Sequence, residues 1–343
     1  MTGRIVKIHP EAAGLLIVVS VSGGKDSTSL ILALLEAVDR GEVPRHLLRF
    51  AFADTGWEAP ETYAYLDYLR QKIGIEIVVV GVDGGMRARI RHRAGFPGRM
   101  QRWCTRELKI EPLREYHDQL ITETGIETVS AMGIRAAESP DRAEMPEWAD
   151  EPPGERSWGG YVWRPLLTWT VEDVLRIHNR HGVKVNPLYQ RGHNRVGCYP
   201  CIFASKDEIR LIAEHAPERI DEIHQIEAEM SALRHQRNEE RPGRYAHPDD
   251  AHFFQTRRQG FGGIRAVVAW ARTDHGGRPR RAVGACAGGS ATCQRKRRCL
   301  RLIRISRTGR TPRRDSRGHA PYADTSSWTT PRARRVVLFE WSP

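Results

Sequence analysis

The sequence predicts an α/β fold: a doubly wound parallel sheet with a helical C-terminal extension. Apolar runs of strand length alternate with stretches of helical periodicity, and short polar turns follow several of these runs. Strands that alternate with helices pair in parallel and are covered by helices on both faces. A length of 343 residues with 40% hydrophobic side chains is enough for such a core. Because ligands of these sheets bind beyond the carboxyl ends of the strands, we expect a nucleotide site at that edge.

The elements of the sheet domain follow one another in order. Apolar runs predict strands at residues 15–21, 47–53, 75–80 and 128–133. Helical patterns predict helices at residues 27–39, 60–73 and 106–124, the last with a break at Pro112. The helix at 60–73 has proline in its first position and Gly74 after its end, a common arrangement. The stretch 138–163, rich in proline, glycine and acidic residues, is expected to form an extended loop or lid.

The following part of the chain is predicted to be helical. Capping boxes at Thr170 and Ser205 each begin a helix, and another helix begins at Pro217. In this last helix an apolar stripe predicts a core face or a contact in a homo-oligomer. The stripe consists of Ile220, Ile223, Ile226 and Met230. We therefore expect a nucleotide-binding domain at residues 1–200, a helical extension at 201–271 and a basic, disordered tail at 272–343.

The net charge of +12 is concentrated in this tail. Residues 272–343 contain 18 Lys and Arg against 4 Asp and Glu, a balance of +14, so residues 1–271 have a balance of −2. An arm of this composition lacks the apolar periodicity of a folded domain, and it could bind the phosphates of nucleic acid without sequence preference. Alternatively, residues 272–343 are not a selected protein sequence, because translation of a gene in a shifted reading frame would give a similar composition.

Membrane and secretory signals are not apparent in the sequence. No stretch approaches the roughly 20 apolar residues of a membrane-spanning helix, and residues 1–10 lack the layout of a secretory signal. We therefore expect a cytoplasmic protein without membrane contact. Six cysteines are too few for a disulfide scaffold in a chain of this length, which leaves metal binding or redox chemistry for clustered cysteines.

A glycine turn with a lysine lies directly between the first predicted strand and the first predicted helix. Glycines let the backbone turn with its amides facing inward, the helix start supplies unpaired N–H groups, and the lysine adds a full charge. The turn therefore predicts a pyrophosphate cradle, with an ordinary strand-to-helix turn as the plainer interpretation. Loops after two later strands, with Asp54 and Thr55 and with Gly133 and Arg135, are expected to converge on the same edge. The turn consists of Ser22, Gly23, Gly24, Lys25, Asp26 and Ser27.

Three cysteines form a second group of candidate residues. Cys198 and Cys201 are spaced as Cys-x-x-Cys ahead of a capped helix, and Cys104 stands alone. A pair at this spacing can direct two thiolates at one metal, with Cys104 as the third ligand. The three thiols could hold a [4Fe-4S] cluster, or Zn²⁺ with His193 or His117 as the fourth ligand. They could also act as a redox pair with a lowered thiol pKa, or pack as small apolar side chains.

Together these segments resemble the phosphoadenosine phosphosulfate (PAPS) reductase family, within the superfamily of PP-loop ATP pyrophosphatases. The resemblance implies a domain of the adenine nucleotide alpha hydrolase type, with the 22–27 loop on the phosphates and Asp54 and Thr55 near the adenosine. It also implies that Lys109 and Arg135 face the phosphates or the substrate anion. The matching segments, which run through most of residues 15–271, are SGGKDS at 22–27, DTGWE at 54–58, RWCT at 102–105, GIR at 133–135, RPL at 164–166, NPLY at 186–189 and GCYPC at 197–201.

Two departures from the PAPS-using members narrow the expected chemistry. Those reductases resemble one another in a phosphate loop without the lysine and in a C-terminal Glu-Cys-Gly-Leu-His motif. This chain has Lys25 and lacks that motif. We therefore expect it to bind ATP with Mg²⁺ and to split ATP into AMP and pyrophosphate while it adenylates a substrate.

The expected reaction assigns a role to each group. Lys25 and Arg135, with Lys109, stabilise charge on the phosphate oxygens, and Asp26 helps to place Mg²⁺. Cys104 and the Cys-x-x-Cys pair handle sulfur from a donor protein, for modification of a nucleotide or nucleic acid. Two other interpretations stay open, namely thiol-dependent reduction of PAPS to sulfite and a non-catalytic module that binds nucleotide or nucleic acid.

Overall fold

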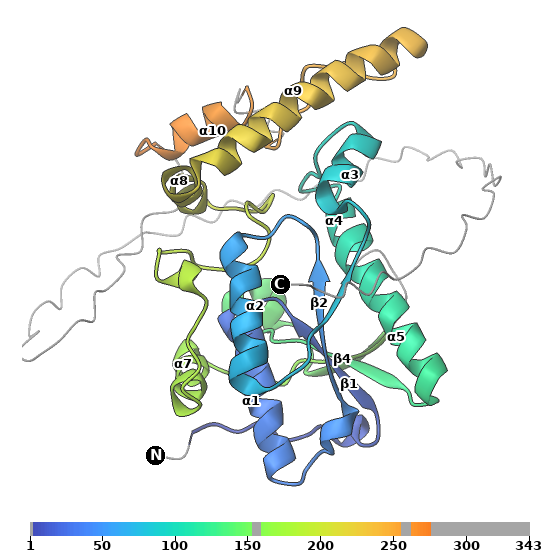
Figure 1. Cartoon of the computed structure of the whole chain (residues 1–343), viewed down its shortest axis with the longest axis vertical. Helices are drawn as coiled ribbons and strands as arrows, with labels where there is room; N and C mark the ends of the chain where they lie inside the picture. Colours follow the sequence, from blue (N-terminus) through green and yellow to red (C-terminus); the bar gives the residue numbers. More distant parts are fainter. Residues whose placement is uncertain (1–2, 153–158, 255–261, 276–343) are drawn as a thin grey trace, which may run out of the picture. The chain divides into compact units, whose positions relative to one another are not determined.

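The computed structural model, which describes residues 3–152, 159–254 and 262–275, is built on a six-stranded sheet (Figure 1). All of these residues lie within one of the two compact units of the chain. The spatial order of the strands is β3-β2-β1-β4-β6-β5, and all neighbours pair in parallel except β5, which is antiparallel to β6. The strands are β1 (Leu16–Val21), β2 (Leu48–Asp54), β3 (Val78–Gly81), β4 (Thr128–Ala131), β5 (Trp148–Glu151) and β6 (Gly160–Trp163).

Helices connect these strands and cover both faces of the sheet. Right-handed crossovers place the helices of the β1–β3 half on one face and the helix that returns to β4 on the other. None of the helices in the described ranges has both the length and the apolarity that a bilayer crossing requires. The helices are α1 (Lys25–Asp39), α2 (Pro60–Ile73), α3 (Gly85–Arg93), α4 (Trp103–Thr105), α5 (Glu111–Thr124), α6 (Pro140–Ala143), α7 (Val171–Arg180), α8 (Lys206–His215), α9 (Pro217–Glu240) and α10 (Ile264–Ala271).

The α/β fold and most predicted elements are confirmed. The four predicted strands correspond to β1–β4, and the third begins at Val78, three residues later than expected. Gly74 ends α2 in the left-handed conformation, with φ of 68°. The side chains of Thr170 and Ser205 accept hydrogen bonds from the third residues of α7 and α8, so both capping boxes are present.

Two predictions about local structure are wrong. The 138–163 stretch is not simply a loop, because it contributes β5 and β6, which pair as a two-stranded edge of the sheet. Each of these strands has only four residues, too few to show a clear periodicity. Pro112 does not break the helix, since a π-helical turn at Arg106–Ile110 leads directly into α5. The helical backbone is continuous through Ile110, so the proline is accommodated directly after a widened π-helical turn.

Helix α3 is absent from the sequence-based prediction. Its sequence, GMRARIRHR, is dominated by arginine and shows almost no apolar stripe. Only Met86 and Ile90 among its large side chains are buried. The helix is therefore held by a few contacts and by ion pairs rather than by an amphipathic face.

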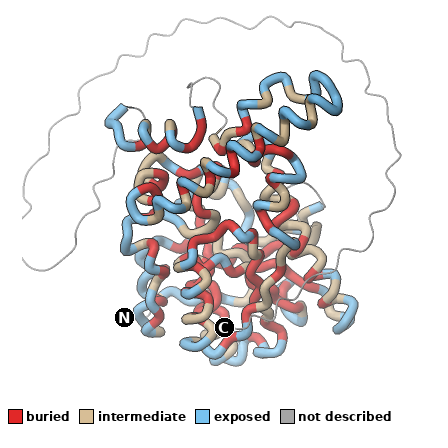
Figure 2. The backbone as a smooth tube through the Cα atoms, turned by 45° about the horizontal axis from the view of Figure 1, so that its top comes forward, coloured by how far each residue is buried: buried red, intermediate tan, exposed pale blue. Residues whose placement is uncertain are grey.

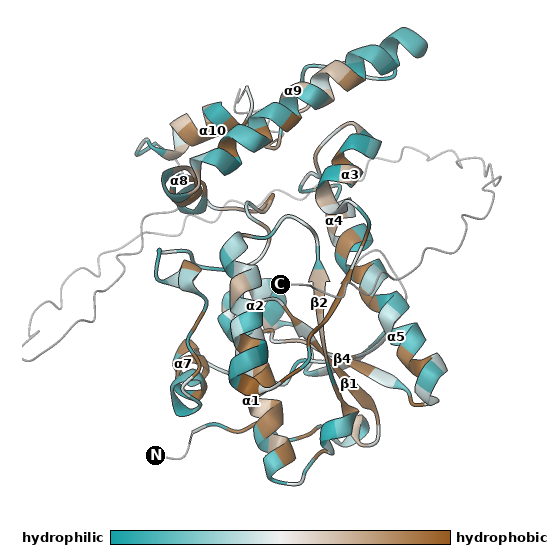
Figure 3. Ribbon diagram, in the orientation of Figure 1, coloured by the Kyte–Doolittle hydropathy of each residue, from teal (hydrophilic) through white to brown (hydrophobic). Residues whose placement is uncertain are grey.

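The buried apolar residues form two clusters. The first surrounds the sheet, whose central strands β1 and β4 are almost wholly buried. Figure 2 shows buried segments in red running through the interior, with exposed segments in pale blue around them. The second joins Trp57, Trp103 and Tyr199 to helices α8–α10. The predicted stripe of α9 belongs to this second cluster, so it is a core face of the chain, although most of α9 is hydrophilic (Figure 3).

Candidate functional site

The glycine turn lies at the point where the strand order reverses. Strand β1 pairs with β2 on one side and with β4 on the other. Strands β2 and β3 extend the sheet in one direction from β1, and β4, β6 and β5 extend it in the opposite direction. The turn runs from the end of β1 into α1, whose N-terminal cap is Gly24, and Gly133 follows β4. Ligands of doubly wound sheets bind at this reversal, beyond the carboxyl ends of the strands. The two predicted loops therefore meet where the fold favours a nucleotide.

The turn is fixed by contacts with α2 and with the segment near residue 186. Gly23 has φ of 69°, and a Cβ added there would lie 2.8 Å from Cγ2 of Thr62. The side-chain amide of Asn186 donates to the Gly23 carbonyl at 3.1 Å, and the Lys25 amide donates to the Tyr189 hydroxyl at 3.2 Å. The loop is thus held in one conformation before any ligand binds.

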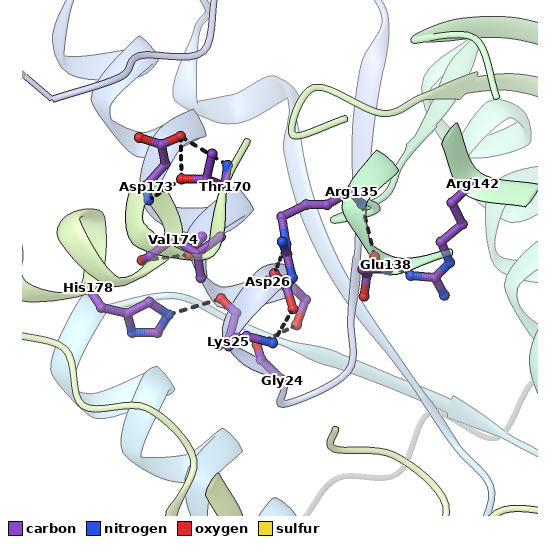
Figure 4. Close-up of polar contacts among 12 residues, drawn as sticks. Gly24, Lys25, Asp26, Arg135, Glu138, Arg142, Thr170, Asp173, Val174 and His178 are labelled. Atoms are coloured by element: carbon purple, nitrogen blue, oxygen red, sulfur yellow. Dashed lines mark hydrogen bonds and ion pairs between the residues drawn. The ribbon is translucent and has the colours of Figure 1, made fainter. Parts of the chain in front are cut away.

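Two cations share the carboxylate of Asp26 at the start of α1 (Figure 4). Nζ of Lys25 lies 2.9 Å from one oxygen, and Nε of Arg135 lies 2.5 Å from the other. Arg135 is only 4% exposed, so its charge is held in place by burial as well as by the ion pair. The N-terminal end of α1 adds the positive end of the helix dipole. The structure therefore brings three predicted residues, Lys25, Asp26 and Arg135, together at the start of α1.

Gly133 allows this site to close. A Cβ at Gly133 would lie 2.8 Å from the carbonyl oxygen of Asp26 and 2.9 Å from the amide nitrogen of Ser27. Both of these are backbone atoms, which cannot turn aside as a side chain can. The absence of a side chain at 133 thus permits the β4 loop to touch the first turn of α1.

The loop after β2 places its polar side chains against protein groups. The Asp54 carboxylate accepts hydrogen bonds from the Gly56 amide and the Tyr63 hydroxyl, both at 2.8 Å. Thr55 is fully buried, and its hydroxyl donates to the carboxylate of Glu58 at 2.7 Å. The same hydroxyl lies 4.0 Å from Sγ of Cys198. This loop therefore joins the nucleotide edge of the sheet to the cysteine pair.

Lys109 lies on the cysteine side of this loop. Its Nζ is 4.0 Å from the Glu58 carboxylate, and negative charge on the Cys198 thiol, with that of Glu58, raises the pKa of Lys109. Glu58 and Cys198 also form an isolated antiparallel bridge. Among the described residues, no hydrogen bond or ion pair joins Lys109 to Asp26 or Arg135. The structure thus groups Lys109 with the thiols.

The three cysteines gather against the second apolar cluster, as the spacing suggested. All three are free thiols. Burial, with charge on Cys198 and Cys201, raises the pKa of Cys104 to about 11. Burial likewise raises the pKa of Cys198, although Lys109 acts in the opposite direction. The expected lowered pKa of the pair is therefore wrong for Cys198, because burial disfavours its charged thiolate form.

The two candidate histidines differ in position. His193 lines a small cavity with Cys198 and Cys201, and its buried Nε2 has no hydrogen-bond partner among the described residues. His117 is 1% exposed and its Nδ1 lies 2.7 Å from the Thr128 hydroxyl, in the sheet domain. Within the ranges that the structure covers, no set of three or more His, Cys, Asp or Glu side chains is arranged to hold a metal ion. The thiols are near one another without forming a finished ligand set.

Comparison with known proteins identifies the family. The phosphoadenosine phosphosulfate reductase domain matches residues 16–204, more than half of the chain. The chain belongs to this family. The resemblance seen in the sequence is therefore confirmed.

Relatives of this PAPS reductase family member are found in phage, archaea and bacteria. An uncharacterized 37.8 kDa protein in the gpa 5' region of Escherichia phage 186 is 33% identical, over 63% of this chain and 75% of that protein. An uncharacterized protein of Methanocaldococcus jannaschii is 30% identical, over 58% of this chain and only 44% of the archaeal protein. Adenosine 5'-phosphosulfate reductase of Allochromatium vinosum is 27% identical, over 50% of this chain and 63% of the reductase.

Solved structures of similar fold include an adenylyltransferase and a PAPS reductase. FMN adenylyltransferase of Candida glabrata, in complex with FAD and pyrophosphate, has 16% identity and a TM-score of 0.41, over 55% of this chain and 57% of that one. PAPS reductase of Candida auris has 16% identity and a TM-score of 0.38, over 54% of this chain and 81% of that one. These are similarities of fold.

Several site residues of this family member were not predicted. Glu58 accepts hydrogen bonds from Thr55 and Trp57 and stands between the two halves of the site. Nε2 of His178, on α7, lies 2.9 Å from the Lys25 carbonyl (Figure 4). Glu58, like Asn186 and Tyr189, lies within a segment that carries the family resemblance, so the resemblance could have identified these three residues as candidates. No local pattern distinguishes His178 from the thirteen other histidines of the chain.

Proposed function

We propose that this protein binds ATP and splits it to AMP and pyrophosphate in order to adenylate a substrate. The observation that carries the proposal is the Lys25–Asp26–Arg135 group at the start of α1, beside the reversal of strand order. A cradle with a lysine suits a nucleotide that has β- and γ-phosphates. ATP has them and PAPS does not.

In the proposed reaction the β- and γ-phosphates lie on the 22–27 loop. A substrate oxygen attacks the α-phosphorus, the bond from that phosphorus to the α,β-bridging oxygen breaks, and pyrophosphate leaves with the electron pair. Lys25 and Arg135 neutralise Asp26, and phosphate oxygens would join its carboxylate as further partners of the two cations. Donors already oriented in this way stabilise developing charge at little reorganisation cost, and one such donor is typically worth a factor of about 100 to 1,000 in rate.

The expected role of Asp26 in placing Mg²⁺ stays a prediction and is not used in the proposed reaction. Both of its oxygens are already paired, one with Lys25 and one with Arg135. Mg²⁺ prefers carboxylate oxygens that are free to enter its octahedral shell. We therefore assign no step to a metal ion at Asp26.

The cysteines are proposed to supply the sulfur half of the reaction. Thr55 contacts Cys198 and lies at the end of β2, so an adenylated substrate at the sheet edge would be close to the thiols. A persulfide that a donor protein places on one thiol would attack the adenylated carbon and displace AMP. A second thiol would then break the S–S bond, which releases the thiolated product and leaves the two cysteines as a disulfide for an external thiol to reduce. The three thiols as placed do not form a ligand set, so no step is assigned to a cluster or to Zn²⁺. Anaerobic iron and zinc analysis of the purified protein tests whether they bind either.

Calorimetry with ATP and AMP tests the nucleotide half. The parent should bind ATP more tightly than AMP. Lys25→Ala should weaken ATP binding by roughly 10- to 150-fold, the range for a lost charged hydrogen bond of about 1.5–3 kcal/mol, and leave AMP binding unchanged. Lys7→Ala, at an exposed lysine outside the site, is the matched control. Equal affinity of the parent for ATP and AMP would contradict the proposal.

Reduction of PAPS to sulfite is the second candidate function. It is favoured by the identity to the adenosine 5'-phosphosulfate reductase and by the three free thiols. Incubation with PAPS and reduced thioredoxin separates the two, because only a reductase releases sulfite. A protein that binds ATP and never releases pyrophosphate in a cell extract that supplies acceptors would instead be a non-catalytic module.

A further inference from the structure

An exposed phenylalanine lies beside the cysteines. Phe203 is 40% exposed, and its backbone amide donates to Sγ of Cys201 at 3.5 Å. In the described ranges no other phenylalanine, tyrosine or tryptophan is exposed. One apolar side chain on a surface is ordinary in itself. Its surroundings decide whether it has a role.

Two arginines stand over this ring. The guanidinium carbons of Arg102 and Arg99 lie 5.0 Å and 5.8 Å from the ring centroid of Phe203. At these distances a guanidinium is attracted to the aromatic face. Arg102 comes two residues before Cys104, so both sides of this surface adjoin the thiols.

These two arginines differ from the others in the same segment. Residues 87–106 contain seven arginines, and the other five form ion pairs with glutamates. Arg99 and Arg102 have no carboxylate partner among the described residues, and the one side-chain hydrogen bond of Arg102 is a 3.4 Å contact with the Thr105 hydroxyl. Their positive charge is therefore available to an anion from outside. The five paired arginines are Arg87, Arg89, Arg91, Arg93 and Arg106.

We propose that Arg99, Arg102 and Phe203, here called the arginine platform, dock a single-stranded segment of nucleic acid. An aromatic ring stacks a base of any sequence, and flanking guanidiniums bind the adjoining phosphates. A duplex does not offer its base faces, and a small anion would leave the ring unused. The combination of one accessible ring with two unpaired positive charges matches an unpaired strand.

The arginine platform lies beside the cysteines that are proposed to transfer sulfur. Cys201 and Cys104 lie two residues from Phe203 and Arg102, so a docked base would stand next to the thiols. The platform thus names the class of acceptor for the proposed adenylation and sulfur transfer. The role of the docked strand as acceptor rests on the proposed function, whereas binding of the strand to the platform does not require ATP.

Binding of short fluorescent oligo(dT) and oligo(U) to the full chain, measured by anisotropy without ATP, tests the docking. Phe203→Ala should weaken binding by about 5- to 150-fold, the range for one lost base stack. Phe203→Trp should retain affinity, and Arg102→Gln should lower the salt dependence by about one phosphate contact. Leu175→Ala, at a residue 41% exposed on α7, and Arg176→Gln are the matched controls. The two oligonucleotides distinguish DNA from RNA as the ligand.

Photo-cross-linking locates the bound strand, because the basic tail is also expected to bind phosphates. An oligonucleotide with 5-iodouracil should cross-link to the peptide that contains Phe203. Cross-links confined to residues 272–343, or equal affinities of Phe203→Ala and Leu175→Ala, would overturn the proposal and leave the platform to a protein partner. Because no ATP is present, this failure would not touch the proposed ATP chemistry, which the Lys25→Ala calorimetry tests separately.

Discussion

Replacement of Gly133 by alanine tests whether the close approach of the β4 loop to α1 shapes the nucleotide site. The added methyl group would lie 2.8–2.9 Å from three backbone atoms of Asp26 and Ser27, whereas ordinary contact begins at 3.4 Å. Either the loop or the helix start must therefore move by roughly 0.6 Å, the difference between 3.4 Å and 2.8 Å. Overpacking of this kind typically costs about 1–3 kcal/mol of stability.

The same movement should weaken ATP binding. Arg135 lies two residues after Gly133 and pairs with Asp26, so a displaced loop separates Arg135 from Asp26. If one charged hydrogen bond to the phosphates is lost, about 1.5–3 kcal/mol, then the ATP dissociation constant rises roughly 10- to 150-fold. Calorimetry with ATP and urea unfolding measure the two effects on the same preparation.

Gly262→Ala is the control, because nothing lies within 4 Å of a Cβ built there and its backbone is not left-handed. It should leave both the ATP affinity and the unfolding midpoint close to those of the parent. If Gly133→Ala behaved like Gly262→Ala in both measurements, the contact between the β4 loop and α1 would not determine the site.

Three further predictions concern the supports of the site. Gly23→Ala should lower stability by about 1–3 kcal/mol in urea unfolding and weaken ATP binding, since φ is 69° and the methyl would lie 2.8 Å from Thr62. Asn186→Ala should cost about 1 kcal/mol and loosen the turn, because its amide donates to the Gly23 carbonyl; calorimetry should show weaker ATP binding and unchanged cysteine alkylation. Burial lowers the pKa of His117 from 6.5 to about 4, so the native state holds the neutral ring. The contribution of the neutral His117 ring to the free energy of unfolding is fully present above about pH 6.5, and about 3 kcal/mol of it is lost as the pH falls from there through 4. In urea titrations His117→Gln should therefore lose less stability than the parent between neutral and acidic pH.

The sheet could be predicted because its signals are local. The runs that became β1 and β2 are buried at most positions and therefore appear in the sequence as largely hydrophobic stretches, whereas β4, with the sequence TVSA, is equally buried but half polar. The glycine turn was legible for the same reason, since its residues are contiguous and its position between strand and helix is fixed by the chain. The edge pair β5 and β6 was missed because four-residue strands depend on their neighbour for stability.

The contacts between the glycine-turn part of the site and the cysteine part could not be predicted from local sequence signals. Lys109 was expected to face the phosphates or the substrate anion, and the structure groups it with Glu58 and Cys198, across contacts that join residues far apart in sequence. Burial also reversed the expected direction of the Cys198 pKa. Desolvation depends on what packs around a group in three dimensions, and no spacing rule contains that information.

The carboxylate of Glu58 has a consequence for how such a chain can evolve. It is almost wholly inaccessible to solvent and serves Thr55 on one side and Lys109 on the other. A descendant that lost its thiols would still need Glu58 as the counter-charge for Lys109. A descendant that lost Lys109 would leave the buried Glu58 carboxylate without its cation, at a cost of several kcal/mol of stability. Positions 55, 58 and 109 are therefore expected to be inherited or discarded as a set, whatever residue occupies position 198.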